Sequence, residues 1–182
     1  MFGQFKRELI KIHNMLSDKD ILVLIKTKKL TIQPFSKKSI GCASVDLSLG
    51  DCFCKYTKTI DTHSNKTKLV FSKNNKIILK PNQFVLATTK EKVHLVNGYY
   101  GFIETRGNFS RAGISISCDD GHIDPGTNGQ ITLEIKNNNT VPVILYAGDY
   151  LCQLFVFKLS SLCKKIYSGK YQRQCIPTAF KI

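Results

Sequence analysis

The sequence lacks the features of a secreted or membrane-embedded protein. No apolar run approaches the ~20 residues that a membrane-spanning helix needs. The N-terminal stretch MFGQFKRELIKIHN has no continuous apolar segment like that of a secretory signal. There is no C-x-x-C, and the seven cysteines are odd in number and scattered, as is typical of free thiols in a reducing compartment. We therefore expect a cytoplasmic protein without a membrane partner.

Several catalytic motifs are also missing. None of the four histidines begins an H-x-E sequence and there is no P-C-x-x-C, so the ligands of the zinc-dependent nucleobase deaminases are absent. The chain also lacks G-x-x-x-x-G-K-[ST], G-x-S-x-G and G-x-G-x-x-G, the motifs of P-loop NTPases, α/β-hydrolases and Rossmann domains. Nothing favours cysteine–histidine catalysis, and we expect each cysteine to be a small buried apolar residue.

Arginine is scarce in a chain that is strongly basic. The net charge is +14, but only four of the 27 cationic side chains are arginines. Such a charge attracts polyanions, so nucleic acids, acidic membrane surfaces and nucleotides are all chemically compatible partners. The lysines are spread singly and in pairs, which favours a solvated surface over a nucleic-acid-binding stripe. Arg106, Arg111 and Arg173 stand in motif-like segments, where a planar guanidinium suits phosphate oxygens.

The chain does contain a long series of short β-type segments, enough for one domain of 182 residues. SDKDILVLIKTKK predicts a short helix, because Ser17 can cap it and Asp18 and Asp20 follow in the first turn. From Leu30 onward, β-type segments alternate with Gly, Pro, Asn and Asp, which predicts a mainly β sandwich, jelly roll or barrel. The expected strands are LTIQP, SVDLSLG, KLVFS, KIIL, QFVLATT, KVHLV, YYGFIET, ISIS, QITLEI, VPVIL and YLCQLFVFKL.

Other segments read as connections or as an extension. DTHSNKTK (61–68) is expected to be a long loop, and KNNNT (136–140) a hairpin turn. Residues 1–14 either extend a helix or form an N-terminal extension before a single domain over residues 15–182. No linker divides the chain.

The stretch GHIDPGTNGQITLEI combines a turn with a strand that carries a carboxylate. Period two places Leu133 on the apolar face of this strand and Glu134 on the polar face. From the strand alone, Glu134 is expected to be a solvated surface residue. DPGTNG predicts a tight turn, with Pro125 and Gly126 at its centre and Asp124 able to cap it.

Two further segments carry weak signals of phosphate binding. ETRGNFSRAG places two arginines five residues apart around a Gly-Asn step, a pattern that could surround phosphate oxygens. The C-terminal YSGKYQRQ has no apolar periodicity, and its composition alone is typical of a disordered tail.

In order along the chain, these segments resemble the dCTP deaminase family, whose members deaminate dCTP, hydrolyse dUTP, or do both. The resemblance covers nearly the whole chain from Met15, and SVDLSLG and IDPGxxGxxTLE are its most specific parts. The blocks are MLSDKDI, LTIQPF, ASVDLSLG, FVLATTKEKV, ETRGNFSRAG, HIDPGTNGQITLEIKN, VILYAGDYLCQLFVF and YSGKYQRQ. The resemblance implies a homotrimer of distorted jelly-roll subunits, dUTPase-like in fold. It also implies active sites at subunit interfaces and a C-terminal tail (about 166–182) that closes over the nucleotide.

The resemblance also implies roles for individual residues. Glu134 would be the general base, taking a proton from the water that attacks C4 of cytosine. Arg111 would position that water and polarise the base. Asp124 would hold the deoxyribose 3′-hydroxyl and, in members that cleave dUTP, orient the second attacking water. Residues implied to bind substrate are Arg106, Gly107, Asn108, Ile123, Thr127, Tyr167, Lys170 and Gln174. The reaction would need no zinc, and Mg²⁺ would be bound mainly through triphosphate oxygens.

At two places the sequence departs from the family pattern. Gly107 and Asn108 stand where two serines are usual, and the first of these serines normally helps to hold the attacking water. Losing one such hydrogen bond would cost roughly 1 to 3 kcal/mol. Thr127 stands where an aromatic residue is common near the sugar and base.

Four functions therefore stay open at the level of sequence. The first is dCTP deamination to dUTP and ammonia, with or without hydrolysis to dUMP and pyrophosphate. The others are dUTP hydrolysis alone, nucleotide binding without catalysis, and nucleic-acid binding driven by charge, which the scattered lysines disfavour. A methylated or hydroxymethylated cytosine nucleotide is an alternative substrate.

Overall fold

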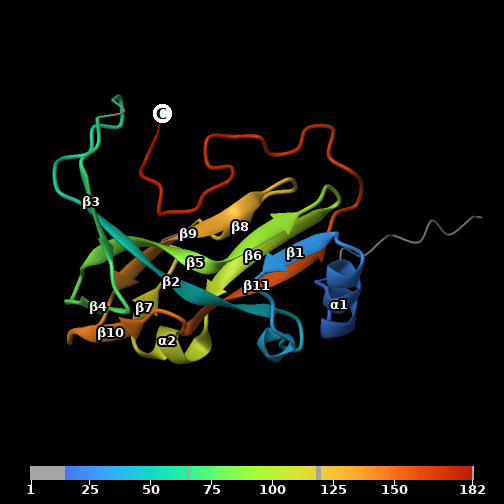
Figure 1. The fold of residues 1–182 in the computed structure, drawn as a ribbon, viewed down its shortest axis with the longest axis horizontal. Coiled ribbons are helices and arrows are strands. Elements are labelled where there is room, and N and C mark those ends of the chain that lie inside the picture. The colour runs from blue at the N-terminus through green and yellow to red at the C-terminus, as the bar shows by residue number, and fades with distance from the viewer. Residues whose placement is uncertain (1–14, 65, 118–119, 182) are drawn as a thin grey trace, which may run out of the picture.

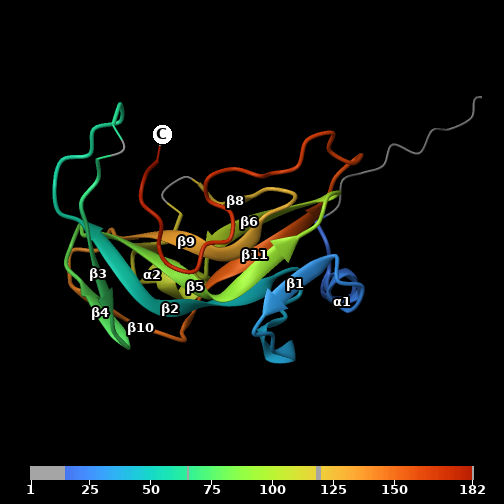
Figure 2. The same cartoon turned by 45° about the horizontal axis from the view of Figure 1, so that its top comes forward.

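The structure is a computed structural model that describes residues 15–64, 66–117 and 120–181, and it is mainly β with few helices. Its central feature is a curled antiparallel sheet (Figures 1 and 2). The strands are β1 (Leu30–Gln33), β2 (Val45–Tyr56), β3 (Leu69–Lys73), β4 (Lys76–Leu79), β5 (Phe84–Leu95), β6 (Tyr99–Thr105), β7 (Ile114–Ser115), β8 (His122–Ile123), β9 (Asn128–Asn137), β10 (Val143–Tyr146) and β11 (Tyr150–Lys158). The helical segments are α1 (Asp18–Lys26), the 3₁₀ turn η1 (Lys37–Ser39) and α2 (Gly107–Arg111).

The strand order of the sheet is β7-β9-β5-β2-β11-β6-β8, with β1 added beside β5 and β3 beside β2. A separate ribbon pairs β10 with β4. Long central strands β2 and β5 carry the apolar core, in which Leu47, Leu49 and Phe53 are almost fully buried. The expectation of a mainly β fold is thus confirmed. The N-terminal extension proposed for residues 1–14 lies outside the described residues.

Helix α1 begins and packs as the sequence predicts. Ser17 occupies the N-cap position in an extended conformation, although its hydroxyl donates to the Asp20 carboxylate instead of capping a backbone amide. Ile21 and Leu24 are buried, so the helix is held by one apolar stripe against the sheet. No helix in the described part of the chain is long and apolar enough to cross a membrane.

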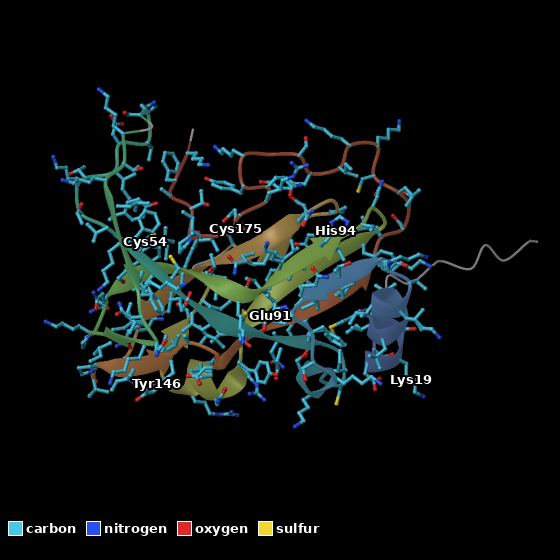
Figure 3. All side chains as sticks on the ribbon, in the orientation of Figure 1. Lys19, Cys54, Glu91, His94, Tyr146 and Cys175 are labelled. Atoms are coloured by element: carbon cyan, nitrogen blue, oxygen red, sulfur yellow. The ribbon has the colours of Figure 1, made fainter. Side chains whose placement is uncertain are left out.

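Two strands expected from the sequence, QFVLATT and KVHLV, are a single strand, β5. Its pairing with β9 is irregular between Thr88 and Lys92, so β5 passes through the interruption instead of ending there. Glu91 lies within this irregular stretch, only 6% exposed, and accepts the Ser48 N–H at 2.8 Å. Figure 3 labels Glu91 in the middle of the sheet. The buried carboxylate accepts a backbone amide of the neighbouring strand β2, which explains why a charged residue lies inside β5.

The hairpin expected around residues 136–140 is wrong. The chain does turn after β9, but β10 pairs with β4 and not with β9. Asn137 explains the change of partner, because its side-chain amide donates to the carbonyls of Leu79 and Val141, each at 2.9 Å. The long loop expected at 61–68 is confirmed, since the described part of 57–68 contains neither helix nor strand.

The cysteines are only partly as expected. The six described cysteines are free thiols, and Cys54 and Cys152 are buried. Cys42 and Cys175 are exposed, so the expectation that every cysteine is a buried apolar residue is wrong for these two. Both lie in segments without regular strand structure, where no core packing recruits them.

Candidate functional site

A cavity of about 380 Å³ lies between the sheet and the C-terminal tail, here defined as residues 166–181. In Figures 1 and 2 the tail, drawn in red, runs over β8 and β9. Six of the residues predicted from the sequence line this cavity: Ile123, Asp124, Thr127, Glu134, Tyr167 and Gln174. Segments that are more than 30 residues apart in the sequence therefore line one cavity.

The turn of DPGTNG forms one wall of the cavity. The Thr127 N–H donates to the Asp124 carbonyl at 3.1 Å, and Gly126 at the third position has φ +96°. This is the turn predicted from the sequence, with a glycine where the backbone must be left-handed. The turn is tied to β5, because Gly126 N–H donates to the Leu95 carbonyl at 2.7 Å. His94, labelled in Figure 3, donates from Nδ1 to the Thr127 carbonyl at 3.0 Å.

Strand β9 forms the floor of the cavity with its polar face. Leu133 and Ile135 are fully buried in the core, whereas Thr132 and Glu134 are half-buried and line the cavity. The period-two assignment of faces is confirmed. Glu134 is not the solvated surface residue that the strand alone suggests, because the tail covers this face. Its backbone is held by a hydrogen bond to the chain just after β7, because the Glu134 N–H donates to the Ile116 carbonyl at 2.7 Å.

The tail is held by specific contacts, in contrast to the disorder that its composition alone suggests. The Tyr167 N–H donates to the Pro125 carbonyl at 2.8 Å, and the Gln130 N–H donates to the Gln174 carbonyl at 2.9 Å. The Thr132 hydroxyl donates to the Gln174 side-chain oxygen. Farther along the tail, the Phe180 N–H donates to the Tyr56 hydroxyl at 2.8 Å. These bonds place Tyr167 and Gln174 over the cavity.

The arginine segment does not line the cavity. Gly107, Asn108 and Arg111 form the exposed helix α2, which the sequence did not predict, and Figure 1 shows α2 and the tail at opposite sides of the sheet. The chain after α2 lies against Asn139, which is beyond the end of β9. Because a strand rises about 3.3 Å per residue, this point is roughly 10 Å or more from Glu134.

Arg106 and Lys170, the other two cations expected to meet phosphate, also point elsewhere. The Arg106 guanidinium pairs with the Asp46 carboxylate at 3.3 Å. The Lys170 ammonium donates to the Lys181 carbonyl, and Lys170 lines a second, more open groove between the tail and β3. Within a single chain, six of the eleven residues predicted for the site therefore line the cavity, and the other five lie outside it.

Comparisons with known proteins agree with this geometry. The family model described as dCTP deaminase-like matches residues 15–159. The chain belongs to the dCTP deaminase-like family. It is 38% identical over 176 residues to a protein of Persephonella marina named "dCTP deaminase, dUMP-forming", with 92% of this chain and 97% of the relative covered. A protein of Dictyoglomus turgidum with the same name is 36% identical over 183 residues, with 92% and 94% covered.

Solved structures share the fold at lower sequence identity. A 2'-deoxycytidine 5'-triphosphate deaminase from Agrobacterium tumefaciens superposes with a TM-score of 0.65 at 18% identity. That comparison covers 80% of this chain but 48% of the other, longer chain. A dUTPase from phage phi11 of S. aureus has a TM-score of 0.50 at 16% identity, with 78% and 97% covered. The mainly β, curled architecture is therefore shared with dUTPase-like proteins.

Several residues at the site of this dCTP deaminase-like protein were not identified from the sequence. His122 lines the cavity and its ring is hydrogen-bonded to the Tyr100 hydroxyl. Tyr171 and Tyr56 line it from the tail and from β2. The spacing of Tyr167 and Tyr171 in YSGKY was the one available signal. Tyr56 gave none, because only the curl of the sheet brings β2 to the tail.

Proposed function

We propose that this protein deaminates dCTP to dUTP and ammonia and then hydrolyses dUTP to dUMP and pyrophosphate. The observation that carries the proposal is that Glu134 and Asp124 line one cavity beneath the tail. The relatives' name, "dCTP deaminase, dUMP-forming", supports the same pair of steps.

In the first step Glu134 acts as general base. Its carboxylate takes a proton from a water molecule while the water oxygen bonds to C4 of cytosine. Glu134 passes that proton to N3, which has received the electron pair of the C4=N3 bond. It then takes the remaining proton of the C4 hydroxyl and delivers it to N4, so that C4=O forms, the C4–N4 bond breaks and ammonia leaves. Rigid placement matters for such a transfer, and the backbone ladder of β9 supplies it. A positioned carboxylate of this kind accelerates reactions by about 10²- to 10⁴-fold.

In the second step Asp124 orients another water toward the α-phosphorus of dUTP, so that the bond to the pyrophosphate leaving group breaks. Asp124 is well placed for this role, because the DPG turn holds it at the edge of the same cavity. Before hydrolysis the same carboxylate would accept a hydrogen bond from the 3′-hydroxyl of the sugar. Ile123 and Thr127 would pack beside the sugar and base, and Tyr167 and Gln174 would cover them from the tail.

A homotrimer of jelly-roll subunits would complete the site. Because α2 is too far from the cavity of its own chain, we propose that Arg111, Gly107 and Asn108 reach a neighbouring subunit's cavity across the interface. Arg111 would then polarise the cytosine and hold the attacking water, and Arg106 would exchange Asp46 for phosphate. Lys170 would turn from the tail carbonyl to the triphosphate. The exposed position of α2 is compatible with such a contact.

We propose that Mg²⁺ binds together with the nucleotide, through its triphosphate. The described residues contain no group of three or more His, Cys, Asp and Glu side chains suited to hold a metal ion. Mg²⁺ commonly keeps several waters and binds through substrate phosphates, so a protein cage is not needed. Its contribution would be to neutralise phosphate charge when the nucleotide binds.

The test is to supply the purified protein with magnesium and either dCTP or dUTP, and to measure ammonia, pyrophosphate and the nucleotides formed. We expect ammonia and dUMP from dCTP. Glu134→Gln should lower ammonia release by about 10²-fold or more, whereas Glu104→Gln, an exposed carboxylate on β6, should not change it. Unchanged ammonia release in Glu134→Gln would show that the proposed base is wrong.

Hydrolysis of dUTP alone is the second candidate. Gly107 has no hydroxyl to hold the deaminating water, whereas Asp124, the residue proposed for dUTP cleavage, lies at the cavity. This function predicts pyrophosphate from dUTP without ammonia from dCTP. Asp124→Asn should then abolish pyrophosphate release.

A further inference from the structure

We propose that Gln172 is a positioning residue for the nucleotide site, and that its side-chain amide fastens the tail to the turn carrying Asp124 and Thr127. The inference rests on the proposed function for its kinetic consequences, but the fastening itself can be measured without catalysis. Gln172 does not line the cavity, so its effect on a nucleotide would act through its neighbours.

The amide of Gln172 uses both of its polar atoms. Its Nε2 donates to the Gly126 carbonyl and to the Tyr167 carbonyl, each at 2.8 Å. Its Oε1 accepts the Asn128 N–H at 2.9 Å. One half-buried side chain therefore joins both sides of Thr127 to the start of the tail. An amide is suited to this arrangement because it carries donors and an acceptor in one plane.

Backbone hydrogen bonds near Gln172 also connect the turn (residues 124–128) to the tail, and we call this set of contacts the junction. The Tyr167 N–H donates to the Pro125 carbonyl at 2.8 Å, and the Arg173 N–H donates to the Asn128 carbonyl. Each side of the turn thus meets the tail twice, once through the backbone and once through Gln172. The turn and the tail form a single hydrogen-bonded unit.

Two glycines allow the tail to come this close. A Cβ on Gly126 would lie 3.0 Å from the Tyr167 carbonyl oxygen, and one on Gly129 would lie 2.6 Å from the Gln174 nitrogen. Gly129 also has φ +146°, which L side chains rarely adopt. Gly129 therefore leaves the space that the tail backbone occupies, and any larger residue there would push the tail away from the cavity.

The kinetic effect expected from the loss of Gln172 depends on which nucleotide-contacting residues the junction holds in place. Asp124, Thr127, Tyr167 and Gln174, all proposed to contact the nucleotide, depend on it. The backbone of Glu134 is held separately, by pairing with Leu86 and by its N–H bond to the Ile116 carbonyl. Loss of Gln172 should therefore weaken nucleotide binding and leave the chemical step nearly intact.

The experiment compares Gln172→Ala and Gln172→Glu with the wild type and with Gln83→Ala, a control that removes a side-chain amide that accepts the Lys80 N–H and does not line the cavity. We expect KM for dCTP to rise about tenfold or more in both Gln172 variants, as the loss of two or three hydrogen bonds implies. kcat should stay within about threefold. Gln172→Glu tests the donors specifically, because it keeps an acceptor but places a carboxylate against two carbonyls.

Hydrogen exchange in the free protein provides the readout that needs no catalysis. The amides of Asn128, Tyr167 and Arg173 should exchange faster in both Gln172 variants than in the wild type or in Gln83→Ala. Gly129→Ala should produce the same changes in exchange and KM without touching the Gln172 side chain. The double variant Gln172→Ala with Gly129→Ala should be no worse than the more severe single variant, because both release the same contact.

The outcomes separate this inference from the proposed function. Unchanged exchange in the Gln172 variants overturns the fastening, whatever the enzyme does. A KM within about twofold of the wild type, or a kcat that falls as much as kcat/KM, overturns the positioning role. If the wild type turns over neither dCTP nor dUTP, the proposed function fails, while the exchange measurement still decides whether Gln172 holds the tail.

Discussion

At the scale of single residues, Asn137 shows how one buried side chain can determine the path of the chain. It is completely buried at the end of β9, and its amide donates to the carbonyls of Leu79 and Val141. Its Oδ1 accepts the Asn139 N–H at 2.9 Å. These bonds connect β9, β4 and the segment before β10, so the partner of β10 depends on them.

We expect Asn137→Ala to lower the free energy of unfolding by about 2 to 4 kcal/mol, because it leaves the buried Leu79 carbonyl, the Val141 carbonyl and the Asn139 amide without this partner. Urea unfolding followed by circular dichroism would measure the change. Asn138→Ala is the matched control, since Asn138 is exposed and its side chain donates to the Ser115 hydroxyl. Equal stability of the two variants would contradict the role assigned to Asn137.

The Cys54 thiol makes stability sensitive to alkaline pH. Burial raises the pKa of Cys54 from 9.0 to about 11, and the neighbouring Cys52 adds to the effect. The unfolded thiol ionises near pH 9 while the folded one keeps its proton, so the unfolded state gains stability as the pH rises through this range. The contribution is fully present below pH 9 and is lost as the pH rises toward about 11.

The wild type should therefore lose on the order of 2 kcal/mol more unfolding free energy between pH 8 and 11 than Cys54→Ala loses. Urea unfolding at several pH values, with other ionisations common to both chains, isolates this difference. Parallel pH profiles for the two chains would show that the thiol does not contribute.

At the scale of elements, the tail is a covering segment and not part of the core. The buried apolar cluster contains no residue beyond Val156, whereas six tail residues line the cavity. The described tail has no helix or strand of its own, and its hydrogen bonds to the rest of the chain go to β9, the DPG turn and Tyr56 of β2.

A chain that ends at residue 165 should keep its fold and lose its affinity for nucleotide. We expect the thermal midpoint to fall by no more than about 3 °C, since little apolar area leaves the core. Calorimetric titration with dUTP and magnesium should show binding weakened by about 100-fold or more, as the tail supplies several contacts at once. Unfolding of the shortened chain well below the wild-type midpoint would indicate that the tail is part of the core.

At the scale of the whole molecule, the separation of α2 from the cavity predicts a site shared between subunits. Arg111→Ala and Glu134→Gln should each be nearly inactive alone. If the two chains are unfolded together and refolded, the proposed homotrimer should assemble from them at random, and about a quarter of its sites should combine an intact Glu134 with an intact Arg111.

Such a mixture should recover about a quarter of the wild-type ammonia release from dCTP. Mixing without unfolding is the control, because intact trimers exchange no chains on the time of the assay if the interface is stable. Recovery only at the level of the single variants after refolding would place both residues in the same chain's site.

The parts of this structure that depend on neighbouring residues were predictable from the sequence. The period-two faces of β9, the glycine of the DPG turn, and the N-cap position and apolar stripe of α1 all follow from local geometry. The resemblance of the motif blocks indicated the family, and six of the residues that it implied do lie at one cavity.

The rest required long-range contacts that no local pattern encodes. Pairing with β9 continues on both sides of the irregularity in β5. The Asn137 side chain bonds to the end of β4, beside which β10 pairs. Gly129 and Gln172 hold the tail in place, although its composition is typical of a disordered segment. Sequence by itself determined which residues could form strands and turns, since those preferences depend on a few neighbouring dihedral angles. Only the tertiary structure decided which strands pair and which polar residues share a cavity. The reason is that buried polar groups form their hydrogen bonds with groups that are distant in the sequence.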